Sequence, residues 1–257
     1  MLHYSCLKNS DPTVSWLTFI HGAGGNSSIW HLQVRFFKRF YHLLLVDLRG
    51  HGKSAGHNAV EEYTFDNVTE DIVEVLDQEN IKKSHFVGIS LGSILIRKLA
   101  DSHPERMSKL ILAGAILNLN LRSKCLMYLG KATQSFLPFI WIYSFFAHVI
   151  MPYKNNSEAR SLFIREAKKL SQQEFLRWYK LTHELLPHLK YFRQKKIKIP
   201  TLYIMGNQDY MFLSFVKKNV ALDKSADLLI LNKCGHVVNI ERPDEFNQGM
   251  LNFLQMD

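Results

Sequence analysis

The sequence predicts an α/β fold in which a mainly parallel sheet is covered by helices on both faces. Short apolar runs alternate with helical periodicity over residues 16–117 and resume after residue 199. Between them, residues 118–198 contain no convincing strand and hold 14 of the 31 aromatic residues. A structureless loop of that length is implausible in a compact domain. We therefore predict a core formed by residues 1–117 and 199–257, interrupted by a helical cap at 118–198.

The first part of the core alternates strands with helices. The predicted strands are 16–20, 43–47, 85–87 and 109–113, and the predicted helices are 27–40, 63–80 and 91–102. Thr64 is placed as the N-cap of the second helix, because its hydroxyl can accept a hydrogen bond from a free amide of the first turn. Buried apolar strands separated by helices pair in parallel, which predicts helices on both faces of the sheet.

The alternation resumes after the predicted cap. The predicted elements there are a strand at 200–205, a helix at 214–221, a strand at 228–231 and a helix at 243–253. Pro243 suits the first turn of the last helix, where its missing N–H costs nothing.

Composition is that of a soluble globular protein, with 47% hydrophobic and 21% charged residues. The N-terminus has no basic region followed by an apolar run, so we expect no secretory signal. The three cysteines are odd in number and widely spaced, which predicts neither a disulfide framework nor a metal site and favours the cytoplasm. The longest apolar run, 139–151, is shorter than the roughly 20 residues that a membrane span needs.

The positive charge is concentrated in the predicted cap. Residues 118–198 carry 15 Lys and Arg against 4 Glu and no Asp, whereas the rest of the chain is slightly acidic. The simpler interpretation, which we favour, is a solvated basic face over an apolar cap core. The sharper hypothesis is contact with anionic amphiphiles or a membrane surface. We expect no nucleic-acid partner.

A nucleophile motif, G-x-S-x-G, occurs as Gly88-Ile89-Ser90-Leu91-Gly92. It lies between a predicted strand and a predicted helix, which is the context that this motif requires. The turn is so tight that the neighbours two residues away must lack Cβ atoms. The following helix points its N-terminus at the site and favours developing negative charge there. We therefore assign Ser90 as a nucleophile.

Asp209 and His236 are the matching acid and base. Asp209 follows the predicted strand 200–205, so its carboxylate lies at the carboxyl edge of the sheet. His236 follows the last predicted strand, and the preceding glycine permits a tight turn. Asp223 and Asp227 are weaker candidates, because neither directly follows a predicted strand.

The glycine-rich loop His21-Gly22-Ala23-Gly24-Gly25 follows the first predicted strand. Such a loop can turn backbone N–H groups toward a substrate oxygen, and we assign the two oxyanion donors to the amides of Ala23 and Leu91. The stretch 47–54 is interpreted as a structural loop beside this site.

Two nucleotide-binding motifs fail on single residues. A G-x-G-x-x-G fingerprint starting at Gly22 would need glycine at position 27, which is Ser27, and a phosphate-binding loop ending at Ser54 would need glycine at position 47, which is Asp47. We expect no cofactor and no metal.

These motifs together resemble the α/β-hydrolase superfamily, most closely small bacterial esterase-like members with a helical cap. The order Ser90, Asp209, His236 is the nucleophile–acid–histidine order of that superfamily. The resemblance spans residues 16–253 outside the cap. It implies an eight-stranded, mostly parallel sheet with the cap inserted after the sixth strand. Epoxide hydrolases and haloalkane dehalogenases normally carry Asp at the nucleophile, so Ser90 argues against them.

The resemblance is specific for the triad and leaves the substrate open, because similar motifs occur in carboxylesterases, lipases, carbon–carbon bond hydrolases, perhydrolases and a menaquinone-pathway lyase. We expect a serine esterase acting on small, hydrophobic short- to medium-chain acyl esters, with its substrate-binding residues within 118–198. The alternative is a lyase or carbon–carbon hydrolase on an acidic metabolite, whose carboxylates would be clamped by cap arginines such as Arg122, Arg160, Arg165 or Arg177. A non-catalytic binder on the same fold is a third possibility.

Overall fold

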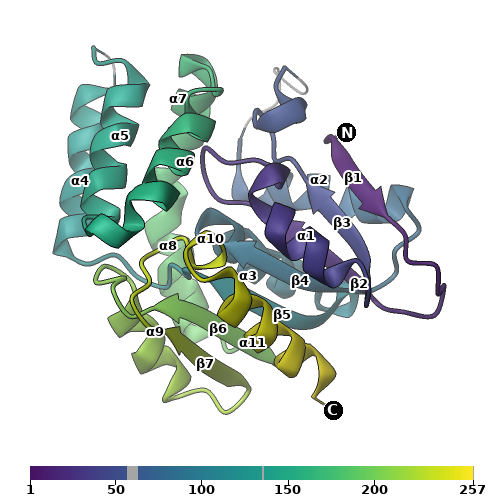
Figure 1. The fold of residues 1–257 in the computed structure, drawn as a ribbon. Coiled ribbons are helices and arrows are strands. Elements are labelled where there is room, and N and C mark those ends of the chain that lie inside the picture. Colours follow the sequence, from purple (N-terminus) through teal and green to yellow (C-terminus); the bar gives the residue numbers. More distant parts are fainter. Residues whose placement is uncertain (57–62, 135, 257) are drawn as a thin grey trace.

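The computed structural model describes residues 1–56, 63–134 and 136–256. Its strands form one sheet in the order β1-β3-β2-β4-β5-β6-β7 (Figure 1). The strands are β1 (Tyr4–Leu7), β2 (Trp16–Ile20), β3 (His42–Val46), β4 (Ser84–Ile89), β5 (Met107–Ala113), β6 (Thr201–Gly206) and β7 (Ala226–Leu231). Among the strands of the described residues, β1 alone pairs antiparallel, with β3, and each of the other pairs is parallel.

The expectation of eight strands is wrong for the described residues, which form seven. The sequence ahead of β2 supplies a single strand, β1, which completes the sheet at its edge beside β3. The helical insertion accordingly follows the fifth strand of this sheet and not a sixth. The mostly parallel α/β fold itself is confirmed.

Helices connect the strands and flank both faces of the sheet. The helices are α1 (His31–Phe37), α2 (Phe65–Gln78), α3 (Leu91–Ser102), α4 (Leu121–Thr133), α5 (Phe139–Ile150), α6 (Ser157–Ala167), α7 (Gln172–Lys180), α8 (Thr182–Gln194), α9 (Leu213–Val220), α10 (Val238–Glu241) and α11 (Pro243–Gln255), and the short 3-10 turns are η1 (Ser27–Trp30), η2 (Gly52–Ser54), η3 (Pro104–Arg106) and η4 (Lys154–Asn156). In Figure 1, α1 and α11 lie in front of the sheet and α2 and α3 behind it. None of the described helices is long and apolar enough to cross a membrane.

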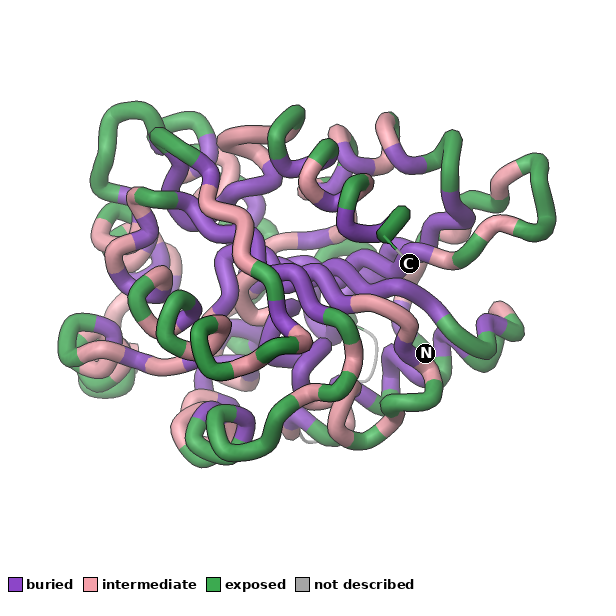
Figure 2. The backbone as a smooth tube through the Cα atoms, turned by 90° about the horizontal axis from the view of Figure 1, so that it is seen from below, coloured by how far each residue is buried: buried purple, intermediate pink, exposed green. Residues whose placement is uncertain are grey.

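Alternation of side chains along the buried strands creates a core on each face. In β4, Phe86 packs with Ile72 and Leu99 on the α2–α3 face, whereas Val87 packs with Phe246 of α11 on the opposite face. All six residues of β4 are buried, including the polar Ser84 and His85, as expected of a central parallel strand that is covered by helices on both faces. The strands form the buried centre of the molecule in Figure 2.

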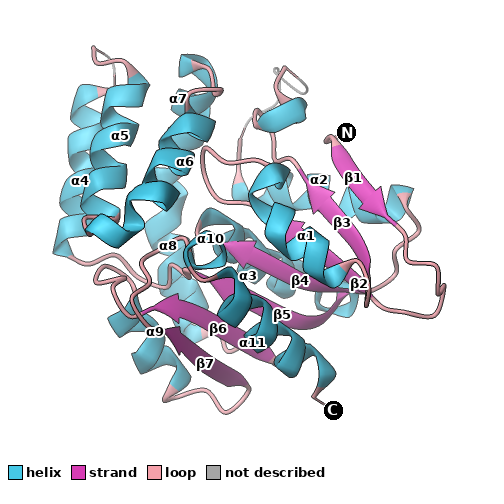
Figure 3. Cartoon of the chain, in the orientation of Figure 1, coloured by secondary structure: helices cyan, strands magenta, loops and turns pink. Residues whose placement is uncertain are grey.

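Helices α4 to α8 fill the stretch between β5 and β6, and none of the residues described between 118 and 198 lies in a strand (Figure 3). These helices stand at the carboxyl edge of the sheet and have a small core of their own, which includes Phe139, Tyr143 and Phe175. We call residues 118–198 the helical segment.

Most predicted elements are confirmed in kind, with shifted ends. The predicted helix 91–102 has the observed bounds of α3, and Thr64 caps α2 by accepting a hydrogen bond from the Asn67 amide at 3.0 Å. The predicted helix 27–40 is wrong in extent: a 3-10 turn, η1, precedes α1, which ends at Phe37. The short strand β1 and the one-turn helix α10 were not predicted.

Candidate active site

Ser90 lies on a strained turn between β4 and α3. Its backbone has φ +54° and ψ −113°, a conformation that residues with a Cβ atom rarely adopt. A Cβ at Gly88 would approach the carbonyl oxygen of Gly92 to 2.6 Å, and a Cβ at Gly92 would approach the carbonyl oxygen of Ile20 to 2.3 Å. The close backbone contacts leave no room for a Cβ atom at either position, so the turn that carries Ser90 requires both glycines of the motif.

The structure brings Ser90, His236 and Asp209 together in one hydrogen-bonded chain. Oγ of Ser90 lies 3.0 Å from Nε2 of His236, and Nδ1 of His236 lies 2.8 Å from Oδ2 of Asp209. His236 and Asp209 are 3% and 1% exposed. Because a carboxylate only accepts, Nδ1 carries the ring proton and Nε2 is free to accept the hydroxyl proton of Ser90. The three residues have the geometry of a nucleophile, a general base and an orienting acid.

Glu241 holds the backbone on both sides of His236. Its carboxylate accepts hydrogen bonds from the amides of Gly235 at 2.7 Å and Val237 at 3.2 Å. Asn156, from the helical segment, donates to the same carboxylate at 2.6 Å and is itself fully buried. The loop of the candidate base is therefore tied to the helical segment through one carboxylate.

The orientation of the Ala23 amide is set by hydrogen bonds to the carbonyl group of Gly22, which belongs to the same peptide unit. The carbonyl oxygen of Gly22 accepts hydrogen bonds from Nδ1 of His21 at 2.7 Å and from the amide of Gly25 at 3.1 Å. Nε2 of His21 accepts from the Leu48 amide, so Nδ1 carries the proton. In a trans peptide the N–H points away from the C=O. The carbonyl is tied back into the loop, which leaves the Ala23 amide directed the other way.

The next peptide unit of the loop is held at both ends. The carbonyl oxygen of Ala23 accepts a hydrogen bond from the phenol of Tyr143, and the amide of Gly24 donates to Nε2 of His51 at 2.9 Å. Gly24 has φ +70°, and a Cβ there would overlap the Tyr143 ring. One contact comes from the helical segment and the other from the loop after β3. Together they fix the candidate oxyanion loop.

His51 is neutral, because complete burial lowers its pKa to about 3. Burial also lowers the pKa of His21, whose ring lies 5.1 Å from that of His51. Neutral rings are needed in both places, because each must accept a backbone N–H at Nε2. The Nδ1 proton of His51 is donated to the carbonyl oxygen of Arg49 at 2.8 Å.

The loop 47–54 lies beside the candidate site. Asp47 accepts hydrogen bonds from the amides of Ser27 at 2.7 Å and Lys53 at 2.9 Å, and these bonds lower the pKa of its carboxyl despite burial. The carboxylate of Asp47 thereby anchors both the start of η1 and the turn that presents His51.

A cavity of about 230 Å³ opens beside Ser90 and is lined almost wholly by apolar and aromatic side chains. Ala23 and Leu91, the assigned oxyanion donors, are part of its wall. Leu91 is the first residue of α3, so its amide has no helix carbonyl to bond. The helical segment supplies aromatic lining residues, which are Tyr143, Phe146, Phe175, Trp178 and Tyr179. The predicted placement of substrate-binding residues within 118–198 remains a proposal that this lining supports.

The four arginines considered as carboxylate clamps do not belong to this cavity. Arg160 donates to the carbonyl oxygen of Met151, Arg165 pairs with Glu166, Arg177 pairs with Glu174 and Arg122 lies over the Tyr210 ring. None of the four is among the described residues that line the cavity.

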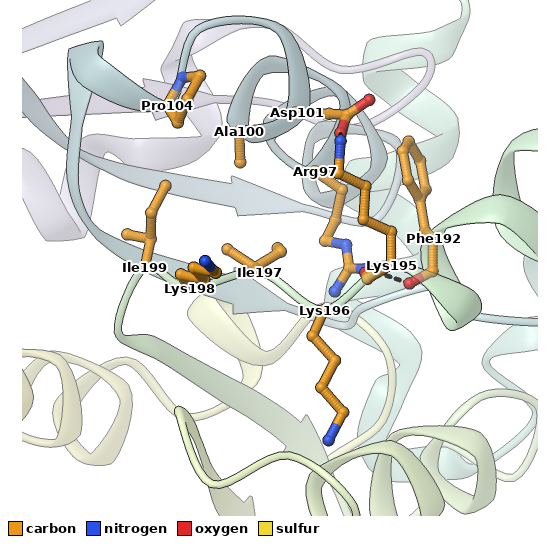
Figure 4. Close-up of a pocket in the computed structure, with 10 residues that line it drawn as sticks. All are labelled: Arg97, Ala100, Asp101, Pro104, Phe192, Lys195, Lys196, Ile197, Lys198 and Ile199. Atoms are coloured by element: carbon orange, nitrogen blue, oxygen red, sulfur yellow. Dashed lines mark hydrogen bonds and ion pairs between the residues drawn. The ribbon is translucent and has the colours of Figure 1, made fainter.

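A second cavity of about 200 Å³ lies where the end of α3 meets the stretch 195–199 (Figure 4). It contains no residue of the candidate triad. Its buried Arg97 points at the carbonyl oxygen of Phe192 and donates to it, and Lys195 pairs with Asp101. These contacts fasten the end of the helical segment to α3. Among the described residues, no group of three His, Cys, Asp or Glu side chains is arranged to hold a metal ion.

The model of a protein family described as having the alpha/beta hydrolase fold matches residues 16–243. The chain belongs to this family. The match covers the candidate nucleophile turn, the acid and the base, together with the whole helical segment.

Curated relatives extend over nearly the same length. A 3-oxoadipate enol-lactonase from Acinetobacter baylyi is 25% identical, with 97% of this chain and 91% of the relative covered. A pimeloyl-[acyl-carrier protein] methyl ester esterase from Wigglesworthia glossinidia brevipalpis is 28% identical, with 88% of each chain covered. The structure of MenH from S. aureus superposes with a TM-score of 0.84 at 22% identity, over 99% of this chain and 98% of that one. The two curated relatives support a hydrolytic enzyme and leave its substrate open, whereas the superposed structure supports the fold.

Several contacts of the site were not predicted from the sequence. Tyr143, His51, Asn156 and Glu241 each support a site loop through a side-chain hydrogen bond. Only His51 had a local signal, because it lies in the loop 47–54 that the sequence placed beside the site.

Proposed function

We propose that this protein is a serine hydrolase that cleaves carboxylic esters of small apolar acyl groups. The observation that carries the proposal is the position of Ser90 Oγ, 3.0 Å from Nε2 of His236 and on the wall of an apolar cavity. The two curated relatives named above are an enol-lactonase and a methyl ester esterase, and a lactone is a cyclic ester.

In the proposed reaction, His236 takes the hydroxyl proton at Nε2 as Ser90 Oγ attacks the ester carbonyl carbon. The bond to the leaving alcohol then breaks, and His236 returns the proton to the leaving oxygen. Water, deprotonated by His236, releases the acid from Ser90 and restores its hydroxyl. Asp209 holds the imidazole and stabilises its cation. No bond changes at Asp209.

The amides of Ala23 and Leu91 are proposed to bind the oxyanion of the tetrahedral intermediate. Removing one such donor typically costs about 3 kcal/mol of transition-state stabilisation. Both residues border the cavity, and the Ala23 amide is preset by the bonds to the Gly22 carbonyl.

We propose that the helical segment acts as a cap that selects the acyl group. The cavity is smaller than the about 300–1,000 Å³ typical of sites for drug-sized ligands, which favours short acyl chains. No Lys or Arg is among its described lining residues, which favours neutral substrates over acidic metabolites.

Two measurements test the proposal. A fluorophosphonate probe is expected to label the protein at Ser90 and not to label Ser90→Ala. A series of p-nitrophenyl esters is expected to show highest kcat/KM at short or medium acyl length, with no inhibition by small dicarboxylates. Absence of labelling in folded protein rules out the nucleophile. Activity restricted to acidic substrates would favour the lyase or carbon–carbon hydrolase instead.

A further inference from the structure

The outer end of the hairpin formed by α4 and α5 exposes an unusual amount of apolar surface. Seven of the thirteen exposed large hydrophobic residues found among the described residues lie between positions 121 and 153. Those nearest the end of the hairpin are Tyr128, Leu129, Phe136, Trp141 and Phe145. We call these five residues the hairpin patch. Phe136 is 71% exposed and Trp141 is 65% exposed, which is far from the burial that large apolar side chains usually find.

The exposed residues of the hairpin patch belong to helices that also bury other side chains. On α5, Phe139, Ile142 and Tyr143 are buried, whereas Trp141 and Phe145, one turn apart, are exposed on the opposite side. On α4, exposed Tyr128 and Leu129 likewise lie away from the buried Gly130, whose Cβ would meet Phe146 and Tyr179. The two helices stand side by side at the outer edge of the molecule (Figure 1).

Charge around the patch has one sign. The stretch from residue 106 to residue 157 contains no Asp or Glu. Lys131 is exposed on the last turn of α4. The turn between α6 and α7, which carries exposed Lys168, lies next to the end of the hairpin, because Gln172 accepts a hydrogen bond from the Phe139 amide. The aromatic surface is therefore bordered by cations with no neighbouring carboxylate on the hairpin.

We infer that the hairpin patch docks on an anionic lipid surface. Exposed Trp, Phe and Tyr side chains insert at the boundary between headgroups and acyl chains, and neighbouring lysines bind anionic headgroups. A second copy of this chain is a poorer occupant, because two such hairpins would bring cations together without any carboxylate to pair them. The inner face of the same α5 lines the cavity beside Ser90 through Tyr143 and Phe146.

The test is flotation of the full chain with vesicles of phosphatidylcholine alone and of an equal mixture with phosphatidylglycerol. All proteins carry Ser90→Ala, so that hydrolysis cannot alter the vesicles and the result is independent of the proposed reaction. We expect recovery with the anionic vesicles, little recovery with the neutral ones, and loss of binding at high salt. Equal recovery with both vesicle types, or none with either, overturns the inference.

The double variant Phe136→Ser/Trp141→Ser is expected to bind the anionic vesicles about tenfold more weakly. The matched control is Leu222→Ser, which removes an equally exposed side chain (74% exposed) from the loop after α9 and is expected to bind as the parent does. Thermal unfolding checks that both variants fold, which we expect because the substituted side chains are exposed. Binding that survives the double substitution assigns the contact to another surface and overturns the inference.

Fluorescence and gel filtration give separate readouts. Addition of anionic vesicles is expected to shift Trp emission to the blue, and Trp141→Phe is expected to remove this shift. Trp30 and Trp178 are already buried, and the half-buried Trp16 packs on the His42 ring in the sheet, away from the hairpin patch. If gel filtration instead shows a dimer that Phe136→Ser/Trp141→Ser converts to a monomer, the occupant is a second copy and the lipid assignment is wrong.

Discussion

Oε2 of Glu241 accepts a hydrogen bond from Nδ2 of Asn156 at 2.6 Å and so joins the helical segment to the loop that carries His236. The same carboxylate accepts the amides of Gly235 and Val237, the residues that flank His236. A single side chain therefore fixes the backbone on both sides of the proposed base. We assign Glu241 as a positioning residue, because it reaches the reaction only through His236.

Glu241→Ala is expected to lower kcat by about tenfold or more with little change in KM. It leaves two backbone donors unpaired, at a cost of about 1–3 kcal/mol each when buried, and frees the His236 loop. The measurement is steady-state hydrolysis of a p-nitrophenyl ester. Glu245→Ala, on the exposed side of α11, is the control and is expected to behave as wild type.

Glu241→Gln is expected to fall between Glu241→Ala and wild type. The amide oxygen can still accept two of the three hydrogen bonds, whereas its NH₂ group faces the remaining donor. A purely structural role would lower stability in both variants without separating kcat from KM. Unchanged kcat in Glu241→Ala would remove the positioning role.

The sequence allowed the α/β fold and the joint placement of Ser90, Asp209 and His236 to be predicted, because these depend on local patterns. Apolar runs identify strands, and residues that follow parallel strands share one edge of the sheet. The structure brings the three together within hydrogen-bonding distance. Their catalytic roles stay a proposal, which the fluorophosphonate experiment tests.

The supporting contacts had no such local signal. Tyr143 and Ala23 are 120 residues apart, and Asn156 and Glu241 are 85 apart. Whether a tyrosine on an apolar helix faces the core, a cavity or solvent depends on tertiary packing that periodicity alone does not give. β1 was missed because only four residues form it and alternate residues are exposed. The hairpin patch was not predicted either, because apolar composition alone does not show which face of a helix meets the core and which stays exposed.

Tyr143→Phe is expected to lower kcat about five- to tenfold, because it removes one hydrogen bond worth about 1 kcal/mol from the Ala23 carbonyl. The fold is expected to persist, since the ring still stacks on Phe163 at 4.6 Å. Steady-state kinetics measure the effect. Tyr128→Phe, on the exposed face of α4, makes the same chemical change away from the site. Equal kcat in the two variants would show that the oxyanion loop does not depend on Tyr143.

His51 is expected to make the protein less stable in mild acid. Its pKa is lowered in the folded state to about 3 from an ordinary value near 6.5, so the unfolded chain binds the extra proton first. The stability that neutral His51 contributes is present above about pH 6.5 and is lost as pH falls toward the folded pKa. The expected slope is about 1 kcal/mol per pH unit near pH 5.

His51→Gln is expected to flatten this dependence. Its side-chain amide can accept from Gly24 and donate to the Arg49 carbonyl without titrating. Urea unfolding at several pH values from about 7 to about 4 measures the slope, because over most of this range the unfolded chain is protonated at His51 and the folded protein is not. His31→Gln, at an exposed position on α1, is expected to leave the slope as in wild type. Identical slopes for His51→Gln and wild type would assign the acid sensitivity to other groups.

Ser90→Gly is expected to be more stable than Ser90→Ala by about 1 kcal/mol, although both lack the nucleophile. The backbone at φ +54° and ψ −113° strains any residue with a Cβ atom, and glycine adopts it freely. In an ordinary helical position the order of stability reverses, because a glycine variant is less stable than the alanine variant by roughly 0.5–1 kcal/mol. Ser93→Gly and Ser93→Ala, three residues on in α3, provide that comparison, since both lose the same hydrogen bond to the Ser90 carbonyl. Urea unfolding of the four variants measures the two differences. A Ser90→Ala protein as stable as Ser90→Gly would mean that the nucleophile turn stores no backbone strain.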